Sequence, residues 1–208
     1  MPILGGGMRG YMEIRALLDF LCIAEKLKCN TRHSYTSSGR HESVAEHSWR
    51  ITLMAMLLEE EFPDADMNKV IRMCLIHDLG EAFTGDIPAF NKTDSDASKE
   101  ENILDDWVDG FSEPTRSKWL SLLKEMNALE TTEAKIYKSL DKIEAIIQHD
   151  EADLSTWIPL EYDLQFSYGQ ENMEFSPYMK EFRRVVDAWT RRKIEEGKKS
   201  PETPPDSV

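Results

Sequence analysis

Two histidines and an aspartate in the first half of the chain have the residue types and spacing of a metal site. His47 is followed by apolar residues at positions 51, 54 and 55, the spacing of one helical face, so its side chain is expected to point into the core. His77 follows apolar residues at positions 70, 73 and 74 with similar spacing, and Asp78 lies next to it. A carboxylate near the core is unfavourable unless it is paired or binds a cation. The pattern fits a metal site, although hydrogen-bonded core histidines fit the periodicity equally well.

The elements that must position these residues are helices, because apolar residues recur with helical spacing through most of the chain. Ser43 and Glu46 form a capping-box pair that begins one helix, and Pro63 stops it. Strand patterns are scarce, so we expect loops at 30–42 and at 158–174. The predicted fold is an all-α bundle of about seven helices. These helices are expected at residues 11–28, 43–61, 67–79, 96–111, 114–129, 132–153 and 177–196.

Length and composition indicate one globular domain. The chain has 208 residues, and its net charge of −14 argues against a nucleic-acid polymer as partner. It has no apolar run of about 20 residues that could span a bilayer, and MPILGGGMRG lacks the features of a secretory signal, so we expect a cytoplasmic protein without a membrane partner. Residues 1–10 are expected to be a flexible N-terminus, 11–197 the domain and 198–208 a disordered tail.

Other reactive or charged residues have simpler explanations. The three cysteines lack CxxC spacing, which argues against disulfides and cysteine-based zinc sites, and we expect Cys22 and Cys74 in the core. His149 lies in the charged segment QHDE and is expected at the surface. Arg183 belongs to a basic final helix that we interpret as solvated or dimer-facing.

Three segments together resemble the ordered signature of the HD superfamily: ESVAEHSWR, LIHDLGEAFTGDIP and KSLDKIEAIIQ. The similarity covers roughly residues 14–152 and is strongest to the small branch of 5′-deoxynucleotidases. It implies a helical phosphohydrolase domain in which His47, His77, Asp78 and Asp141 bind a divalent cation. Asp141 owes this role to the resemblance alone, because it flanks the apolar stripe of its own helix and would otherwise be interpreted as solvated.

The implied ligand set also bears on the cofactor. Two imidazoles and two carboxylates suit Mn, Co, Fe, Ni or Zn, with Mg as a further candidate, and leave positions for water and a phosphate oxygen. HD phosphodiesterases with two metals carry further histidines between the HD pair and the last aspartate. This chain has no histidine between positions 78 and 141, so we expect one divalent ion.

The resemblance further implies catalytic and substrate-binding residues. Glu81 shares a face with His77 if the helix continues through Gly80, and would act on a metal-bound water; a solvated helix end is the alternative. Asp86 would assist that water or hold the sugar, or else only stabilise a turn. Arg32 matches a phosphate-binding arginine. The bacterial deoxynucleotidases that this chain resembles have tryptophan where it has His33, which leaves the choice between deoxyribose and ribose open.

The expected reaction is hydrolysis of a (deoxy)nucleoside 5′-monophosphate by a protein that the resemblance implies to be a homodimer. One alternative keeps the site and changes the substrate to another phosphorylated nucleotide such as a guanosine polyphosphate. A second is a regulatory module that binds nucleotide and metal without turnover. The third is a helical interaction protein with core histidines and no metal.

Overall fold

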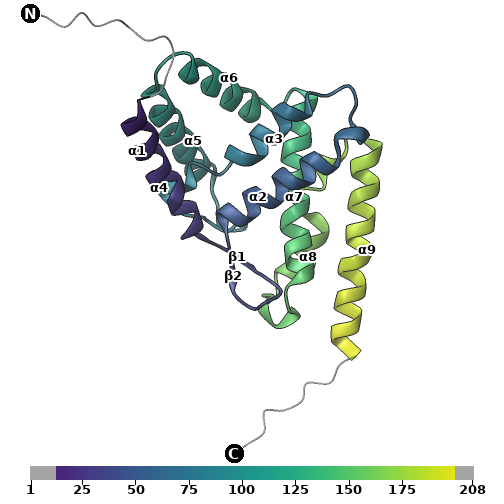
Figure 1. The fold of residues 1–208 in the computed structure, drawn as a ribbon. Coiled ribbons are helices and arrows are strands. Elements are labelled where there is room, and N and C mark those ends of the chain that lie inside the picture. The colour runs from purple at the N-terminus through teal and green to yellow at the C-terminus, as the bar shows by residue number, and fades with distance from the viewer. Residues whose placement is uncertain (1–12, 200–208) are drawn as a thin grey trace, which may run out of the picture.

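The computed structural model describes residues 13–199 and confirms the all-α class (Figure 1). Within those residues, seven helices have ten or more residues and two are shorter. Short 3₁₀ turns and one two-stranded antiparallel ribbon, β1 (Thr31–Tyr35) and β2 (His41–Ser43), complete the domain. The helices are α1 (Ile14–Ala24), α2 (Val44–Leu57), α3 (Met67–Ile76), α4 (Glu81–Thr84), α5 (Asp94–Asp109), α6 (Thr115–Ala128), α7 (Thr132–Glu151), α8 (Glu161–Ser167) and α9 (Pro177–Lys199).

Short polar motifs set the starts of the helices that carry the site. The predicted capping box of α2 is confirmed: the Ser43 hydroxyl accepts from the backbone N–H of Glu46, whose carboxylate accepts from the backbone N–H of Ser43. Helix α7 begins after Thr131, whose hydroxyl accepts from the N–H of Ala134. These caps satisfy amide groups that would otherwise lack a partner at the helix ends. They therefore fix where the inward-facing positions of each helix begin.

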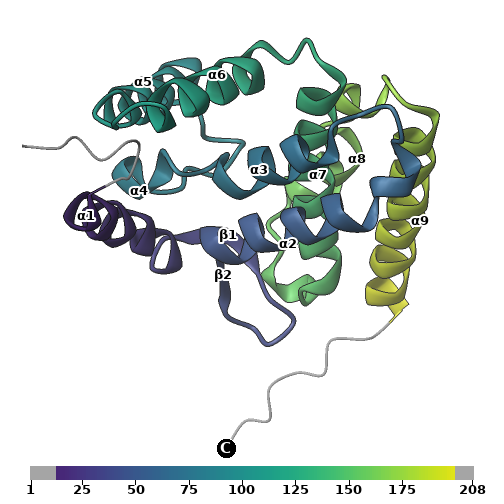
Figure 2. The same ribbon diagram turned by 45° about the horizontal axis from the view of Figure 1, so that its top comes forward.

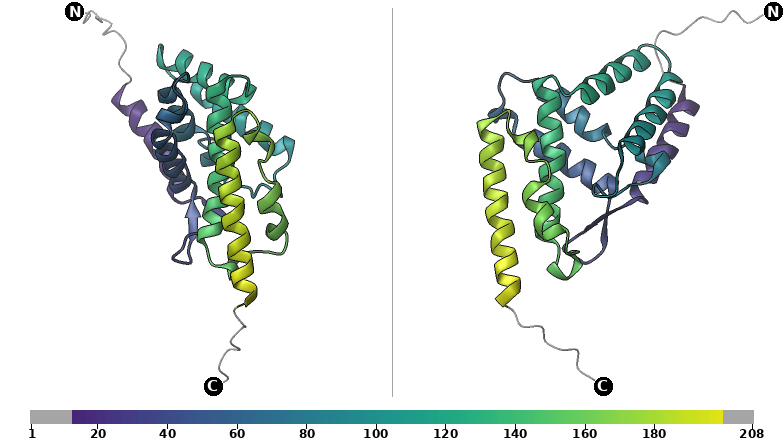
Figure 3. Two further views of the ribbon diagram at one scale, coloured as in Figure 1. Left: turned by 90° about the vertical axis from the view of Figure 1, so that its right-hand side faces the viewer. Right: turned by 180° about the vertical axis from the view of Figure 1, so that it is seen from behind.

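The core lies where α2, α3 and α7 meet, and α9 packs along the outer side of α7 (Figure 3). Figure 2 shows α1, α4, α5 and α6 at one end of the molecule and α8 and α9 at the other, with α2 and α3 between them. Each fully buried aliphatic side chain contributes about 1.5–3 kcal/mol of transfer free energy. Among the central side chains with 0% exposure are Ile51, Ala55, Val70, Met73, Cys74, Ile136, Leu140 and Ile143.

The segment 30–42, predicted as a loop, instead contains all of β1 and most of β2. Thr31 pairs with Ser43 and Tyr35 with His41, and Gly39 in the connecting turn has a φ of +83° that favours glycine. The ribbon is held partly by polar groups, since the buried Ser34 hydroxyl donates to Glu42 at 3.1 Å. Such a strand lacks the apolar alternation on which strand prediction depends.

Helix α3 ends at Ile76, three residues before the predicted end. The chain then turns tightly through Gly80, where a Cβ would lie 2.6 Å from Cγ of Glu100 on α5. Glu81 consequently starts a separate short helix, α4, and does not continue the face of His77. The predicted loop at 158–174 is also wrong in part, because it contains α8.

The ends of the chain bear on the predicted boundaries. Helix α9 includes residues 198 and 199, which were assigned to the tail. The predicted flexible N-terminus at 1–10 and the rest of the tail lie outside the described residues. Between residues 13 and 199, no helix combines the length and apolarity needed to cross a membrane.

Candidate functional site

The four predicted metal ligands converge on one point where α2, α3 and α7 meet. His47 lies in the first turn of α2, His77 caps the end of α3, Asp78 follows it, and Asp141 lies midway along α7. His47 Nε2 is 3.3 Å from Asp141 Oδ1 and 3.9 Å from Asp78 Oδ2. His77 Nε2 is 3.0 Å from Asp78 Oδ2 and 3.7 Å from Asp141 Oδ1.

The donor atoms fit a divalent cation. The His47 side chain is 0% exposed and that of His77 3%, yet their Nε2 atoms have no hydrogen-bond partner of good geometry among the described residues. Nitrogen and oxygen ligands of such ions lie about 2.0–2.2 Å from the metal, which places neighbouring ligand atoms roughly 3 Å apart. Two buried nitrogens and two carboxylates at this spacing could therefore hold a metal ion.

Neighbouring charges keep the two carboxylates ionised. Burial alone would raise the pKa of Asp141, but the ammonium groups of Lys138 and Lys142, at 3.0 and 3.4 Å, hold that pKa well below its ordinary value. Burial would likewise raise the pKa of Asp78, and His77 beside it outweighs that effect and lowers it. The pKa of His77 is raised to about 9, because the nearby carboxylates outweigh its burial. The cluster therefore presents ionised oxygen ligands to a cation.

The ribbon brings Arg32 to the edge of this cluster. Its Nη1 lies 3.6 Å from Asp78 Oδ2 and its Nε lies 3.3 Å from Glu42 Oε2. The side chain is 15% exposed and lines the adjoining pocket. A guanidinium group in this position could bind a phosphate oxygen.

Glu81 also lies beside the cluster, although it projects from the separate helix α4 and not from a continuation of the helix that carries His77. Glu81 is 3% exposed. One of its carboxylate oxygens lies within 4.8 Å of a carboxylate oxygen of Asp78 and of one of Glu100. Burial and the neighbouring carboxylates raise the pKa of Glu81 to about 10, and its Oε2 has no partner among residues 13–199. Such a carboxyl group can hold or release a proton beside the site.

A pocket of about 550 Å³, counting the space open to solvent, adjoins Arg32 and Asp86. Burial raises the pKa of Asp86 above its ordinary value. Pocket volumes of about 300–1,000 Å³ are typical of small-molecule sites. The walls combine apolar and aromatic side chains with a few polar groups. They include Pro88, Phe90, Ile146, Leu164, Gln165 and Tyr168.

The polar end of this pocket contains a carboxylate between two imidazoles. Glu161 Oε1 is 2.8 Å from His149 Nε2 and 3.1 Å from His33 Nε2, and the His33 ring meets Phe90 edge-on. The prediction that His149 is a surface residue is wrong, because its side chain is 18% exposed and lines the pocket. Nδ1 of His149 faces the carbonyl of Ala145 at 2.9 Å, so both ring nitrogens face acceptors.

Sequence reasoning missed four residues of this region: Glu42, Glu144, His149 and Glu161. Glu144 had a signal, since it lies three residues after Asp141 and therefore on the same side of α7. The others carried no such signal, because their roles depend on how β1, α7 and α8 pack, as in the contact between His33 and Glu161.

Two other predictions about single residues are wrong. Cys22 was expected in the core and is exposed on α1, whereas Cys74 is buried as predicted. Arg183 was expected on a solvated or dimer-facing surface and is 1% exposed, because it donates to the backbone carbonyls of Tyr168 and Gln165.

Curated proteins and solved structures resemble the chain over much of its length. The human 5′-deoxynucleotidase HDDC2 is 33% identical over 141 residues, covering 66% of this chain and 68% of the human protein. A Dictyostelium discoideum protein of the same name is 31% identical, covering 63% of this chain and 74% of its own. A crystal structure of a predicted metal-dependent phosphohydrolase from Magnetospirillum magnetotacticum MS-1 superposes with a TM-score of 0.73 at 26% identity, covering 90% of this chain and 98% of its own.

The family model of the HD domain matches residues 24–183, a range that contains all four converging side chains and the pocket beside them. With more than half of its length matched, the chain belongs to the HD-domain family.

Proposed function

We propose that this protein is a metal-dependent phosphohydrolase that releases phosphate from nucleoside 5′-monophosphates. The observation that carries the proposal is the convergence of His47, His77, Asp78 and Asp141 beside the guanidinium group of Arg32. The relatives named 5′-deoxynucleotidase, found in human and Dictyostelium discoideum, support the substrate class.

In this proposal each region of the site has one task. A divalent cation held by the four ligands would polarise the phosphoryl group and lower the pKa of a coordinated water. Arg32 binds phosphate oxygens, and Glu81 and Asp86 hold or accept protons beside the reacting group. The pocket that contains His33 receives the nucleoside, with its aromatic and apolar walls against the base and sugar. The mixed nitrogen and oxygen ligands suit Mn, Co, Fe, Ni or Zn.

We also propose that the protein acts as a homodimer. Helix α2 exposes an apolar stripe at helical spacing, in which Trp49 is 63% exposed, Met56 55% and Leu57 73%. Leu75, on the neighbouring α3, is 56% exposed. Burying such a face against a second copy of the chain would remove it from water. Light scattering tests this: we expect twice the chain mass of 24.0 kDa, reduced to one chain by Trp49→Glu, and a monomeric unmodified protein would contradict it.

The decisive experiment for the reaction measures phosphate release. Metal-stripped protein is supplied with Mn²⁺, Co²⁺, Mg²⁺ or Zn²⁺ and a panel of deoxy- and ribonucleoside monophosphates. We expect metal-dependent phosphate release that Glu81→Gln lowers by about 10²–10⁴-fold. Release of pyrophosphate from a guanosine polyphosphate, with no hydrolysis of monophosphates, would show that the substrate is the polyphosphate. Metal binding without any product would contradict an enzymatic function.

A further inference from the structure

Two fully buried carboxylates lie behind the site and belong to neither the predicted ligands nor the predicted catalytic residues. Glu42 on β2 is 2% exposed and Glu144 on α7 is 0% exposed. One carboxylate oxygen of Glu42, one of Glu144 and one ring nitrogen of His47 all lie within 4.8 Å of one another. Burying two carboxylates so close together is unfavourable unless each one has a strong partner.

Glu144 has such a partner in the metal ligand of α2. Its Oε2 pairs with Nδ1 of His47 across 97 residues of sequence, and its Oε1 lies 3.6 Å from Nη1 of Arg50. When the Nδ1–H of His47 donates to a carboxylate, the lone pair of Nε2 is left to face Asp78 and Asp141. That tautomer is the one that can bind a cation at the converging point.

Glu42 has its partner in the arginine of the ribbon. Its Oε2 accepts from the Ser34 hydroxyl at 3.1 Å and lies 3.3 Å from Nε of Arg32. This contact is an ion pair without hydrogen-bond geometry, and it leaves the terminal nitrogens of the guanidinium group on the side of Asp78, where Nη1 lies 3.6 Å away. Because β1 and β2 pair, the ribbon carries both residues as one unit.

The three donors Glu42, His47 and Glu144 lie close enough together to suggest a metal site of their own. Their partners argue against it. The Nδ1–H of His47 serves Glu144, and the guanidinium groups of Arg32 and Arg50 supply the positive charge that the two carboxylates need. The cluster is therefore better explained as support for its neighbours.

We propose that Glu144 and Glu42 are positioning residues with separate tasks. Glu144 fixes the ring of His47 for the cation, and Glu42 fixes the guanidinium group of Arg32 for the phosphate group. The inference rests on the proposed function, since it assumes a metal at the four ligands and a phosphate at Arg32.

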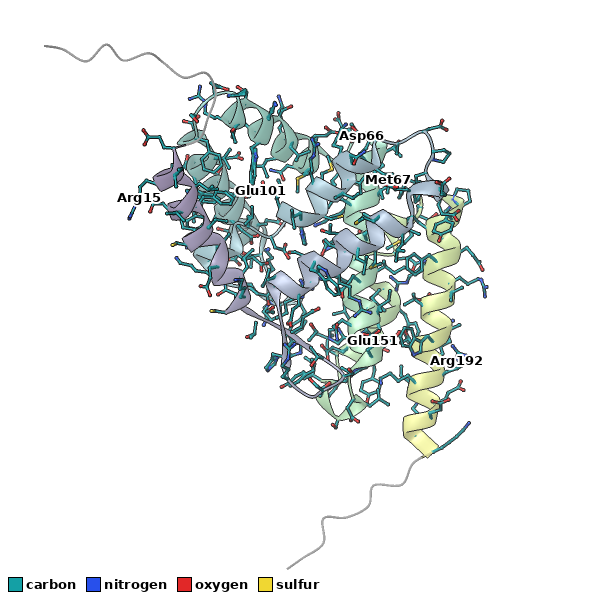
Figure 4. The ribbon with its side chains drawn as sticks, viewed as in Figure 1. Arg15, Asp66, Met67, Glu101, Glu151 and Arg192 are labelled. Atoms are coloured by element: carbon teal, nitrogen blue, oxygen red, sulfur yellow. The ribbon has the colours of Figure 1, made fainter. Side chains whose placement is uncertain are left out.

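The test uses Glu144→Gln, Glu42→Gln and, as matched control, Glu151→Gln. Glu151 is the partly exposed last residue of α7 (Figure 4). Its carboxylate pairs with Arg50 at 2.8 Å. For each variant, calorimetry measures the Kd of Mn²⁺ for metal-stripped protein. It then measures the Kd of inorganic phosphate at saturating Mn²⁺. Thermal unfolding checks that each variant is folded.

We expect Glu144→Gln to weaken Mn²⁺ binding about 10–100-fold, the usual effect of losing such a partner, and to leave phosphate binding within about twofold at saturating metal. Glu42→Gln should do the reverse and weaken phosphate binding about tenfold with Mn²⁺ binding unchanged. Glu151→Gln should change neither. Glu144→Asp should recover part of the Mn²⁺ affinity.

Two results would overturn the inference. One is a Glu144→Gln variant with unaltered Mn²⁺ affinity. The other is an equal change in the Kd of Mn²⁺ and the Kd of phosphate in both Glu144→Gln and Glu42→Gln. If Glu144→Gln does not fold, nuclear magnetic resonance of the Zn²⁺-loaded unmodified protein decides. It should show the proton of His47 on Nδ1, and a proton on Nε2 would overturn the assignment. A protein that binds Mn²⁺ and phosphate without hydrolysing nucleotides would remove the proposed function alone. A protein that binds no Mn²⁺ would remove both.

Discussion

The candidate metal centre and the pocket beside it are built in different ways. The centre takes its ligands from α2, from α7 and from the end of α3, which pack together around the core. The pocket shares one wall with it, from Ala145, Ile146 and His149 of α7, and takes its other walls from β1, the segment 86–90 and α8. Regular helices hold ligand atoms rigidly, whereas loops and short elements tolerate change. This difference suggests that the reaction is fixed by the helices and the choice of substrate by the pocket.

The largest effect is expected at the metal centre, with Asp78→Ala. Removing a carboxylate that faces both histidines and Arg32 should abolish tight metal binding and lower kcat/KM by roughly 10³-fold or more. Metal analysis and phosphate release measure both effects. Asp109→Ala, at a side chain that is 70% exposed on α5, serves as control and should behave like the unmodified protein. Activity retained in Asp78→Ala would break the division between the two regions.

Arg32 lies where the two regions meet, and Arg32→Lys tests that boundary. Lysine keeps the charge but loses the planar fork, so KM for nucleotides should rise about tenfold with metal affinity preserved. The control is Arg40→Lys in the same ribbon, where Arg40 is 58% exposed and pairs with Glu46. If both variants gave the same KM, Arg32 would not bind the phosphate group.

Glu161→Gln tests the pocket alone. The substitution replaces the carboxylate between His33 and His149 by a neutral amide. The ratio of kcat/KM for deoxynucleotides to that for ribonucleotides should therefore change several-fold, while metal affinity stays constant. Glu174→Gln, at an exposed carboxylate paired with Lys180, is the control. A change in metal affinity without a change in the ratio would show that the two regions are not separate.

The smallest effect concerns a buried carboxylate that lies outside both regions. Burial raises the pKa of Asp150 to about 6, only partly offset by the hydrogen bond from Thr190. The folded protein thus binds this proton more tightly than the unfolded chain, and stability is lost as pH rises from about 4 to above 6.

Asp150→Asn should remove that loss. We expect it to raise Tm at pH 8 by roughly 2–4 °C, equivalent to about 1 kcal/mol, and to have little effect at pH 4. Activity should not change. Asp163→Asn, at an exposed position of α8, is the control. An equal gain at both pH values would contradict the ionisation argument.

The sequence predicted the parts of the molecule that follow helical periodicity. The inward positions of His47 and His77, the capping box of α2 and the all-α class all depend on local patterns, and the structure confirms them. The metal-binding roles themselves stay predictions. Asp141 was placed only through the family resemblance, because it flanks the apolar stripe of its helix; in the structure Lys138 and Lys142 pair with it there.

The remaining features depend on contacts that a single sequence does not reveal. The ribbon is held partly by the buried hydrogen bond from Ser34 to Glu42. Arg183 is buried because it donates to backbone carbonyls, which have no signature in the sequence. Glu144 pairs with His47 only because α2 and α7 pack together. Polar contacts between distant segments therefore set the limit of prediction in this protein.

The most direct test of the central claim is a Mn²⁺ titration of metal-free protein with phosphate release from a deoxynucleoside monophosphate followed in parallel. We predict that activity is absent without metal, rises in proportion to the occupancy of the site formed by His47, His77, Asp78 and Asp141, and is lost together with binding in Asp78→Ala. Full activity in the metal-free protein, or saturable binding that Asp78→Ala leaves intact, would contradict the account.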